Sequence, residues 1–420
     1  MQKIAILGYG GRGKNYANIL RMEFRSKAKI VAVIDNIAAK REVAKKELHL
    51  SDDMIFSSLD EFLKKEKCAD WLLICTQDCD HYEHAMKAMD AGYDLLLEKP
   101  ISGDIKQCLE IEEKSKQKGI KIAVCHVLRY TTFFNKVKQI LDSGVLGDII
   151  SIEMEESVGY WHQAHSYVRG DWRRTEDSTP MILAKCCHDL DMAVYLAQSK
   201  CKTVSSIGKL HHFRKECAPD GCAERCVDCK ITDCPYDARK LYIEKFKKLP
   251  FFLRKSAWPM NRLVPDAIPS VPKLEKALRE GQFGKCVYHS DNDAVDFQVV
   301  QMLFENGINC TLTMTAFSQN PYRTIIVRGT KGHLQGKFES FKLDLNIYGK
   351  RKKAVRAKLD LRSHGGGDTG LIASLMGGTM KTDISESIES HIIAYAAEKS
   401  RTENGKMIDV QDLKNSITQN

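Results

Sequence analysis

The chain has 420 residues, of which 43% are hydrophobic and 28% are charged, a composition typical of a globular protein large enough for two domains. It has no apolar run of about 18 residues, so no transmembrane helix is expected. The net charge of +9 is spread along the chain without a block of like charges, which argues against a nucleic-acid-binding tail. Because the first predicted strand starts at the N-terminus, no signal peptide is expected. We therefore expect a cytoplasmic protein with reduced cysteines.

A glycine-rich turn with the pattern Gly-x-Gly-x-x-Gly follows the first apolar run, at Gly8, Gly10 and Gly13. Gly8 allows the tight turn from strand to helix, Gly10 lets the backbone approach a pyrophosphate, and Gly13 lets the helix pack closely on the strand. The N-terminal N–H groups of the helix would face the phosphates. A second apolar run ends in Asp35, where a carboxylate would bind a ribose 2′-hydroxyl. The pattern predicts a dinucleotide site for NAD rather than NADP.

Residues 1–125 alternate short apolar runs with amphipathic segments, the pattern of βαβ units around a parallel sheet. The predicted strands are Ile4–Leu7, Ile30–Ile34, Trp71–Cys75, Leu95–Leu97 and Ile122–Cys125. The predicted helices between them include His81–Ala91 and Ile105–Lys118. We therefore predict an N-terminal Rossmann domain over residues 1–125.

Residues 126–420 are predicted to form a second, α/β domain with a large open, mostly antiparallel sheet. Its predicted strands are Ile149–Glu155, Val299–Phe304, Cys310–Ala316 and Thr324–Arg328. Its predicted helices are Asn135–Ser143, Pro180–Gln198 and Ile384–Glu403, the last packing back on the fold. Residues 211–275, with a cysteine cluster, a basic stretch and several prolines, are predicted to be an insertion with its own local structure.

Glu98, Lys99 and Pro100 follow the fourth predicted strand. Open α/β sheets bind their ligands beyond the carboxyl ends of the strands. Pro100 biases Lys99 toward an extended backbone, which would aim its side chain into the cleft. A lysine close to the nicotinamide would carry a proton to or from a substrate hydroxyl. A surface lysine paired with Glu98 is the alternative.

The glycine pattern together with Glu98-Lys99-Pro100 resembles the glucose–fructose oxidoreductase / inositol dehydrogenase / MocA (Gfo/Idh/MocA) family. The segment from Lys185 to Asp191 shares the resemblance, as do Trp71–Gln77 with His81, beside the nicotinamide ribose, and the turn Gly329–Gly332. The resemblance implies a Rossmann domain joined to an α/β domain with a large open sheet. It also implies NAD(P)-dependent oxidation or reduction of a sugar, sugar acid or polyol carbinol, by a homodimer or homotetramer. The residues expected at the cofactor are Gly8, Tyr9, Gly10, Gly11, Arg12, Gly13, Asp35, Thr76, Gln77, His81, Glu98 and Lys99.

Lys99, His188 and Lys185 are the predicted catalytic residues. Lys185 and His188 are three positions apart, which would put them on one face of a helix. A histidine titrates near neutrality and suits proton transfer. Many members of the family carry an aspartate four residues before this histidine, where this chain has Ala184, and Lys185 is expected to supply the polar group instead. A histidine with a structural role is the alternative, and the two aspartates that follow it are expected to form salt bridges.

A polar and aromatic stretch over residues 160–173 is expected to bind the substrate. Sugar sites combine aromatic faces with charged groups, and two close arginines would suit a carboxylate or sulfonate. An ordinary loop with salt bridges is the alternative. A second candidate lining is the glycine-rich segment 364–368, which would allow close approach of a ligand. The predicted substrate-binding residues are His162, Tyr167, Arg169, Trp172, Arg173, His364 and Asp368.

The cysteine cluster predicts a structural Zn²⁺ site, since four thiolates at short spacings can close a tetrahedral site in a loop-rich segment. The predicted ligands are Cys222, Cys226, Cys229 and Cys234. An iron–sulfur cluster and free thiols are the alternatives.

Three hypotheses follow for the function. The first is an NAD(P)-dependent dehydrogenase in which Lys99 and His188 take the hydroxyl proton while hydride leaves the same carbon. The second is a redox-neutral, NAD-dependent glycosidase that works by transient ring oxidation and elimination. The third is a catalytically silent NAD-binding sensor, which the presence of both Lys99 and His188 argues against. The expected partner is a small carbohydrate, with neither nucleic acid nor membrane.

Overall fold

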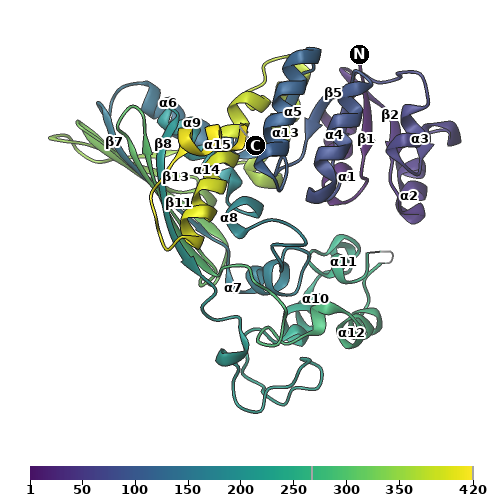
Figure 1. Ribbon diagram of the computed structural model, residues 1–420. Helices are drawn as coiled ribbons and strands as arrows, with labels where there is room; N and C mark the ends of the chain where they lie inside the picture. Colours follow the sequence, from purple (N-terminus) through teal and green to yellow (C-terminus); the bar gives the residue numbers. More distant parts are fainter. Residues whose placement is uncertain (266–267, 419–420) are drawn as a thin grey trace.

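The computed structural model describes residues 1–265 and 268–418 of the chain. Two β-sheets lie on either side of a group of helices, and a segment with little sheet structure extends beneath them (Figure 1). Residues 266–267 of the predicted insertion and 419–420 of the predicted second domain lie outside the described residues. Among the described helices, none is long and apolar enough to cross a membrane.

The first sheet has six parallel strands, and its order places the first strand at the centre. Its strands are β1 (Gln2–Leu7), β2 (Ala28–Ile34), β3 (Ile55–Phe56), β4 (Trp71–Ile74), β5 (Asp94–Leu97) and β6 (Ile122–Val124). The spatial order is β3-β2-β1-β4-β5-β6, so the order reverses beside β1. Its helices are α1 (Gly11–Glu23), α2 (Ala38–Leu48), α3 (Leu59–Leu63), α4 (His81–Asp90) and α5 (Ile105–Lys118). The predicted parallel Rossmann sheet is confirmed, and each of its five predicted strands is present.

Both faces of the first sheet are covered, which explains why its strands are continuous apolar runs. Ile4 and Ile6 of β1 pack into one hydrophobic cluster with α1, whereas Ala5 and Leu7 pack into another with α4 and α5. Alternate side chains of one strand therefore serve two layers of helices.

The second sheet has nine strands and is mostly antiparallel, as predicted. Its strands are β7 (Ile149–Ser157), β8 (Cys201–Lys209), β9 (Phe297–Phe304), β10 (Asn309–Thr315), β11 (Tyr322–Gly329), β12 (Gly332–Lys337), β13 (Lys342–Ile347), β14 (Lys353–Arg356) and β15 (Ile408–Asp409). The spatial order is β14-β13-β12-β11-β7-β10-β9-β8-β15. β7 and β10 form a parallel pair inside this sheet, because the long connection between them allows β10 to return in the same direction.

The helices between the sheets are α6 (Thr132–Asp142), α8 (Met181–Ala184), α9 (Cys187–Ala197), α13 (Gly367–Gly377), α14 (Ile384–Thr402) and α15 (Val410–Thr418). Two of these regions differ from the prediction. The predicted helix 180–198 is interrupted by a turn at Lys185 and Cys186, where Cys186 has non-helical backbone angles (φ −91°, ψ 3°). The glycine-rich segment predicted as a loop leads into α13, whose Leu371 and Ile372 pack against the first sheet. Gly365 and Gly366 precede α13 with positive φ angles, and only Gly367 of the three successive glycines lies in the helix.

The predicted insertion has its own hydrophobic cluster, separate from the cores of the two sheets. Its helices are α10 (Lys245–Lys248), α11 (Met260–Leu263) and α12 (Val271–Glu280). The cluster also includes residues of the segment 160–168, which begins with α7 (Tyr160–His162), and it extends to Tyr288. The insertion therefore packs directly on the polar and aromatic stretch predicted to bind the substrate.

Candidate active site

The glycine-rich turn fits a dinucleotide. Gly8 has a positive φ of +91°, and a Cβ there would lie 2.6 Å from the Cys75 carbonyl oxygen. A Cβ on Gly13 would lie 2.0 Å from the carbonyl oxygen of Gly8. A Cβ on Gly10 or Gly11 would meet no atom within 4 Å among the described residues. Gly8 and Gly13 are thus needed for close packing. Gly10 and Gly11 border open space at the start of α1, which is the space that bound phosphates would occupy.

Asp35 lies at the carboxyl end of β2 beside this turn and is buried. Its carboxylate accepts hydrogen bonds from the backbone N–H groups of Tyr9 (2.8 Å) and Ile37 (2.9 Å). The acidic side chain is therefore held at the edge of the sheet at which open α/β sheets bind nucleotides.

Arg12 connects the glycine turn to the strand that carries Lys99. Its Nε donates to Glu98 Oε1 (2.6 Å), and its Nη2 donates to Asp368 Oδ1 (2.8 Å). Burial would raise the pKa of Glu98, but Arg12 and Lys99 bring it below its ordinary value. Asp368 is buried, and it also contacts Asn15 and His364 at 3.0 Å. Asp368, predicted to bind substrate, instead links α13 to the glycine turn.

Lys99 and His188, from two separate motifs, lie near enough for the charge of Lys99 to act on His188. Lys99 Nζ donates a hydrogen bond to the carbonyl oxygen of Ala184 (3.0 Å), at the end of α8. His188 is half-buried near the start of α9, and its Nδ1 is buried without a partner among the described residues. Burial lowers the pKa of His188 well below its ordinary value, and the positive charge of Lys99 adds to that shift. His188 is therefore neutral at pH 7 and able to accept a proton.

The other predicted cofactor residues border the same turn. His81, the first residue of α4, is buried, and its Nδ1 lies 2.7 Å from the carbonyl oxygen of Pro100. Thr76 Oγ1 lies 3.1 Å from His84 Nδ1, and Gln77 is exposed. His81 thus supports the backbone that carries Lys99.

Lys185 belongs to a cluster of four charged side chains. Its Nζ lies 3.0 Å from Glu156 Oε1 of β7, and Glu156 Oε2 lies 2.7 Å from Arg323 Nη2 of β11. Arg323 Nε in turn donates to Asp189 Oδ1 (2.7 Å). Because α8 and α9 are separated at Lys185, this lysine and His188 do not share one continuous helix. The predicted salt bridge of Asp189 is present, but it is buried.

Glu156 and Arg323 were absent from the sequence prediction. They are paired with each other across neighbouring strands of the second sheet. Glu156 shares the buried face of β7 with Ile152 and Met154, and Arg323 has the same two-residue period as buried Ile325 and Val327 of β11. A charged residue at an inward-facing strand position was therefore the local signal that could have found them.

The predicted substrate-binding stretch has several different environments. His162 is half-buried, with its ring 5.3 Å from that of Trp258, and Lys185 contributes to the lowering of its pKa after burial. Trp172 Nε1 donates to Asp78 Oδ2 (3.1 Å). Arg173 pairs with Asp291 (3.0 Å), and Tyr167 is buried. His162 and Trp172 are thus the members best placed to face a ligand.

Arg169 differs most from its predicted role. Its side chain is fully buried, and it donates to the carbonyl oxygens of Lys285 (2.7 Å) and Tyr236 (2.8 Å) and to Cys226 Sγ (3.3 Å). Cys226 and Tyr236 belong to the insertion, and Lys285 belongs to the segment that follows it. Arg169 is therefore a structural residue between the stretch 160–173 and the insertion, because a guanidinium held this way offers no free fork to a substrate.

The structure gathers a different metal-ligand set from the predicted one. One candidate ligand atom from each of Cys222, Cys286 and His289 lies within 4.8 Å of the other two. Among the described residues, Cys226, Cys229 and Cys234 do not join this group, although they line the same cavity. Cys286 and His289 are more than 50 residues away in sequence, which is why spacing alone missed them.

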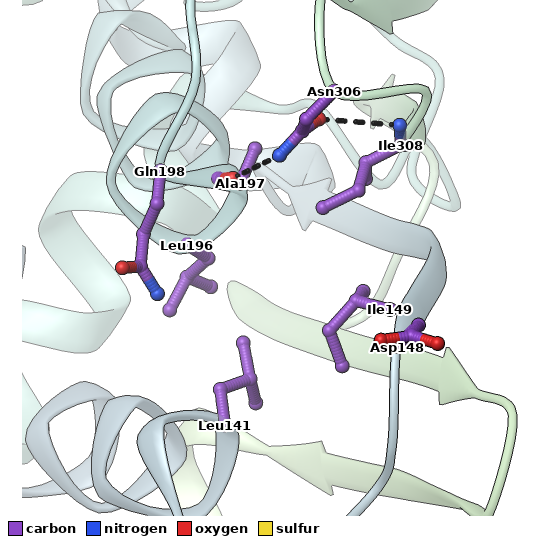
Figure 2. A pocket seen from close by; sticks show the side chains of 8 residues that line it. All are labelled: Leu141, Asp148, Ile149, Leu196, Ala197, Gln198, Asn306 and Ile308. Atoms are coloured by element: carbon purple, nitrogen blue, oxygen red, sulfur yellow. Dashed lines mark hydrogen bonds between the residues drawn. The ribbon is translucent and has the colours of Figure 1, made fainter. Parts of the chain in front are cut away.

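A separate cavity of about 340 Å³ lies at the far end of α9 (Figure 2). It is lined by Leu141, Asp148, Ile149, Leu196, Ala197, Gln198, Asn306 and Ile308. Asn306 bridges its rim, with Nδ2 donating to the Ala197 carbonyl oxygen (2.9 Å). His188 lies about two helical turns away at the other end of α9, so this cavity is not part of the Lys99 site.

Three histidine rings form a row near Lys99. The ring of His126 lies 5.8 Å from that of His188 and 5.7 Å from that of His391, centroid to centroid. His126 and His391 are fully buried, and burial lowers the pKa of all three below the ordinary value, to about 3 for His391. Neither ring nitrogen of His126 has a hydrogen-bond partner among the described residues, and its Nε2 lies 3.9 Å from Asp191 Oδ1.

The lowered pKa values of these three histidines predict that the folded protein loses stability in mild acid. The unfolded chain binds a proton at each histidine near pH 6.5, whereas the folded chain does so only at lower pH. Stability is therefore complete above about pH 6.5 and falls as the pH drops, by up to about 1.4 kcal/mol per pH unit for each histidine. Urea denaturation at pH 7, 6 and 5 measures this slope. His126→Leu should reduce it, whereas exposed His49→Asn should not; equal slopes in both variants would contradict the prediction.

The comparison with family models gives the class of protein. Residues 2–126 match the model described as an oxidoreductase family with an NAD-binding Rossmann fold, and residues 134–227 match the Gfo/Idh/MocA C-terminal domain. Together the two models span about half of the chain. The chain belongs to the Gfo/Idh/MocA family of oxidoreductases, as its motifs indicated.

Individual relatives are distant. YteT of Bacillus subtilis (strain 168) is 21% identical over 397 residues, 89% of this chain and 88% of YteT. A scyllo-inositol 2-dehydrogenase (NADP(+)), IolW, of the same organism is 23% identical over 195 residues, 46% of this chain and 51% of IolW. A 2,7-anhydro-N-acetylneuraminate hydratase of Escherichia coli (strain K12) is 24% identical over 208 residues, 50% of this chain and 53% of that protein. The chain thus spans about half the length of the last two.

A solved structure supports the fold over the whole chain. The inositol dehydrogenase homologue of Azotobacter vinelandii, complexed with NAD+, superposes with a TM-score of 0.68 at 14% identity, covering 97% of each chain. At this identity the similarity establishes the fold alone.

Proposed function

We propose that this chain is an NAD(P)-dependent dehydrogenase, acting on the carbinol or ketone carbon of a sugar, sugar acid or polyol. The observation that carries the proposal is the meeting of Lys99 with the Ala184 carbonyl and with His188, beside a glycine turn that fits a dinucleotide. A sensor without activity would not need a lysine and a neutral histidine at the nicotinamide end of the site.

Lys99 and His188 act on the hydroxyl group of the substrate. A bound nicotinamide supplies the hydride acceptor or donor. His188, neutral because it is buried and near Lys99, accepts the hydroxyl proton, and Lys99 stabilises the negative charge that develops on the oxygen. The ion cluster of Lys185, Glu156, Arg323 and Asp189 fixes α8 and α9 and so positions both groups.

The surroundings of Lys99 favour a polyhydroxylated substrate. His162 and Trp172 offer ring faces, as carbohydrate sites commonly do. Lys185 and Arg323 are each partly exposed and add hydrogen-bond donors for hydroxyl or carboxylate groups.

NAD is the preferred cofactor in this proposal. Asp35 is held by two backbone N–H groups, so its carboxylate remains where a 2′-hydroxyl would bind and a 2′-phosphate would be repelled. Lys40 Nζ lies 4.0 Å from this carboxylate and offsets part of its charge. The NADP(+)-dependent relative IolW makes a direct comparison of the two cofactors worthwhile.

Mass spectrometry of products tests the proposal. Purified protein is mixed with free sugars, sugar acids, polyols and glycosides, each without cofactor, with NAD and with NADP. We expect a product two hydrogens lighter, formed with an equal amount of reduced NAD. Cleavage or hydration of a substrate with no net reduction of NAD would overturn the dehydrogenase in favour of a redox-neutral enzyme, the kind of reaction that the name of the hydratase relative describes. No product from any mixture would favour the sensor.

A further inference from the structure

A short segment of the insertion and a short segment that follows the insertion in the chain are held side by side by the backbone. Arg225 and Lys285 form an isolated antiparallel β-bridge, with the Cys226 N–H donating to the Gly284 carbonyl (2.9 Å) and the Cys286 N–H to the Glu224 carbonyl (2.9 Å). This pairing sets the register between residues 222–226 and 284–289. It therefore brings together cysteines that are far apart in the sequence.

Three side chains from these segments point at one place. Cys222 Sγ lies 3.3 Å from His289 Nε2, and one ligand atom from each of Cys222, Cys286 and His289 lies within 4.8 Å of the other two. Zn–S bonds of about 2.3 Å and Zn–N bonds of about 2.0 Å put the ligand atoms of a tetrahedral site about 3.5 Å apart. The group is thus already close to the spacing that a zinc ion requires.

The second nitrogen of His289 has a partner suited to a metal ligand. His289 Nδ1 lies 3.8 Å from Glu224 Oε1. At 3.8 Å this is a charge contact and not a hydrogen bond; a small movement of Glu224 would let its carboxylate accept from Nδ1 while Nε2 faces a metal. Glu224 lies between two of the cysteines in the sequence, so the same loop would supply both the ligands and this outer partner.

Cys226 is the best fourth ligand. It is buried, lies four residues after Cys222 and lines the same cavity as Cys222 and Cys286. Its sulfur accepts a hydrogen bond from Arg169 Nη2 (3.3 Å). N–H groups that donate to a metal-bound sulfur are the usual outer partners of thiolate ligands.

The charge of Arg169 supports a thiolate site. This guanidinium is fully buried, and among the described residues no carboxylate lies within the 4.0 Å of an ion pair. A buried charge without an opposite charge is strongly unfavourable. Zn²⁺ bound by three thiolates and a neutral histidine carries one net negative charge, which Arg169 balances. Neutral thiols would leave the positive charge of Arg169 without a balancing negative charge.

We propose that the insertion and the segment that follows it bind one structural Zn²⁺ through Cys222, Cys226, Cys286 and His289. Binding releases the three thiol protons and forms three Zn–S bonds and one Zn–N bond, with no change of oxidation state. The ion joins the start of the insertion to the segment 284–289, and through Arg169 it is connected to the stretch 160–173. This site is independent of the proposed dehydrogenase activity.

Metal analysis of the purified full-length chain tests the proposal. We expect about one zinc per chain in the wild type, and tetrahedral sulfur–nitrogen absorption bands when Co²⁺ replaces zinc. Cys286→Ser and His289→Gln should each lose most of the zinc. Cys229→Ser and Cys234→Ser are the matched controls, because these cysteines line the same cavity but are not among the four proposed ligands, and both variants should retain the zinc.

Four results would overturn the proposal. The first is wild-type protein that binds neither zinc nor Co²⁺, and the second is visible absorption from bound iron and sulfide. The third is a full zinc content in both Cys286→Ser and His289→Gln. The fourth is a loss of zinc only in the Cys229 and Cys234 variants. Binding of NAD to each variant serves as the check that the first sheet is folded. Where a ligand variant does not fold, the Co²⁺ spectrum of the wild type decides between sulfur–nitrogen and all-sulfur coordination.

Discussion

Replacing Lys99 with methionine is expected to reduce kcat for the substrate identified above by about 10²- to 10⁴-fold, the range of a positioned proton-transfer group. Methionine has a similar length and keeps most of the packing, but it removes the charge beside His188 and the hydrogen bond to the Ala184 carbonyl. Steady-state kinetics give kcat and KM, and a fluorescence titration gives the Kd for NAD. We expect the Kd to change little, since the glycine turn and Asp35 are untouched.

The matched control is Lys87→Met. Lys87 is a partly exposed lysine of α4 that pairs with Glu83 (2.7 Å) and Asp60 (2.8 Å). It should leave kcat unchanged. If Lys99→Met kept its kcat while Lys87→Met also did, Lys99 would not transfer or stabilise charge at the reacting carbon. A rise in KM with constant kcat would instead assign Lys99 to uniform binding of the substrate.

The cofactor half of the site was predictable because its signals are local. The glycine turn, Asp35 and Lys99 each directly follow a buried strand, and parallel strands bring their carboxyl ends to one edge. The resemblance to the family then added His188, about 90 residues further along the chain. The contact of Lys99 with the Ala184 carbonyl brings the two motifs together.

The substrate half was less predictable because its contacts are long-range. Glu156, Arg323 and His391 come from strands and a helix distant in sequence, and no local pattern links them. Arg169 and Asp368 were predicted from residue type in loops, but both are buried with partners from other segments, Cys226 and Arg12. Residue type predicts which group can bind an anion, whereas only the packing decides whether a protein group already occupies it.

The helix that carries His188 depends on a buried ion pair. Arg129, fully buried, donates two hydrogen bonds to Asp191 of α9, from Nε (2.9 Å) and Nη2 (2.8 Å). Its Nη1 reaches the Lys381 carbonyl (2.7 Å) and Glu386 (2.6 Å), at the start of α14. One guanidinium thus joins the end of the first sheet, α9 and α14.

Asp191→Ala is expected to lower the free energy of unfolding by about 3–5 kcal/mol, because it leaves Arg129 buried without its main counter-charge. Urea denaturation at pH 7 measures the loss. Asp60→Ala, which breaks an exposed pair with Lys87, is the control and should change stability far less. The double variant Arg129→Met with Asp191→Leu removes both charges and should be more stable than Asp191→Ala. If the double variant were the less stable of the two, the pair itself, and not the uncompensated charge, would hold α9 in place.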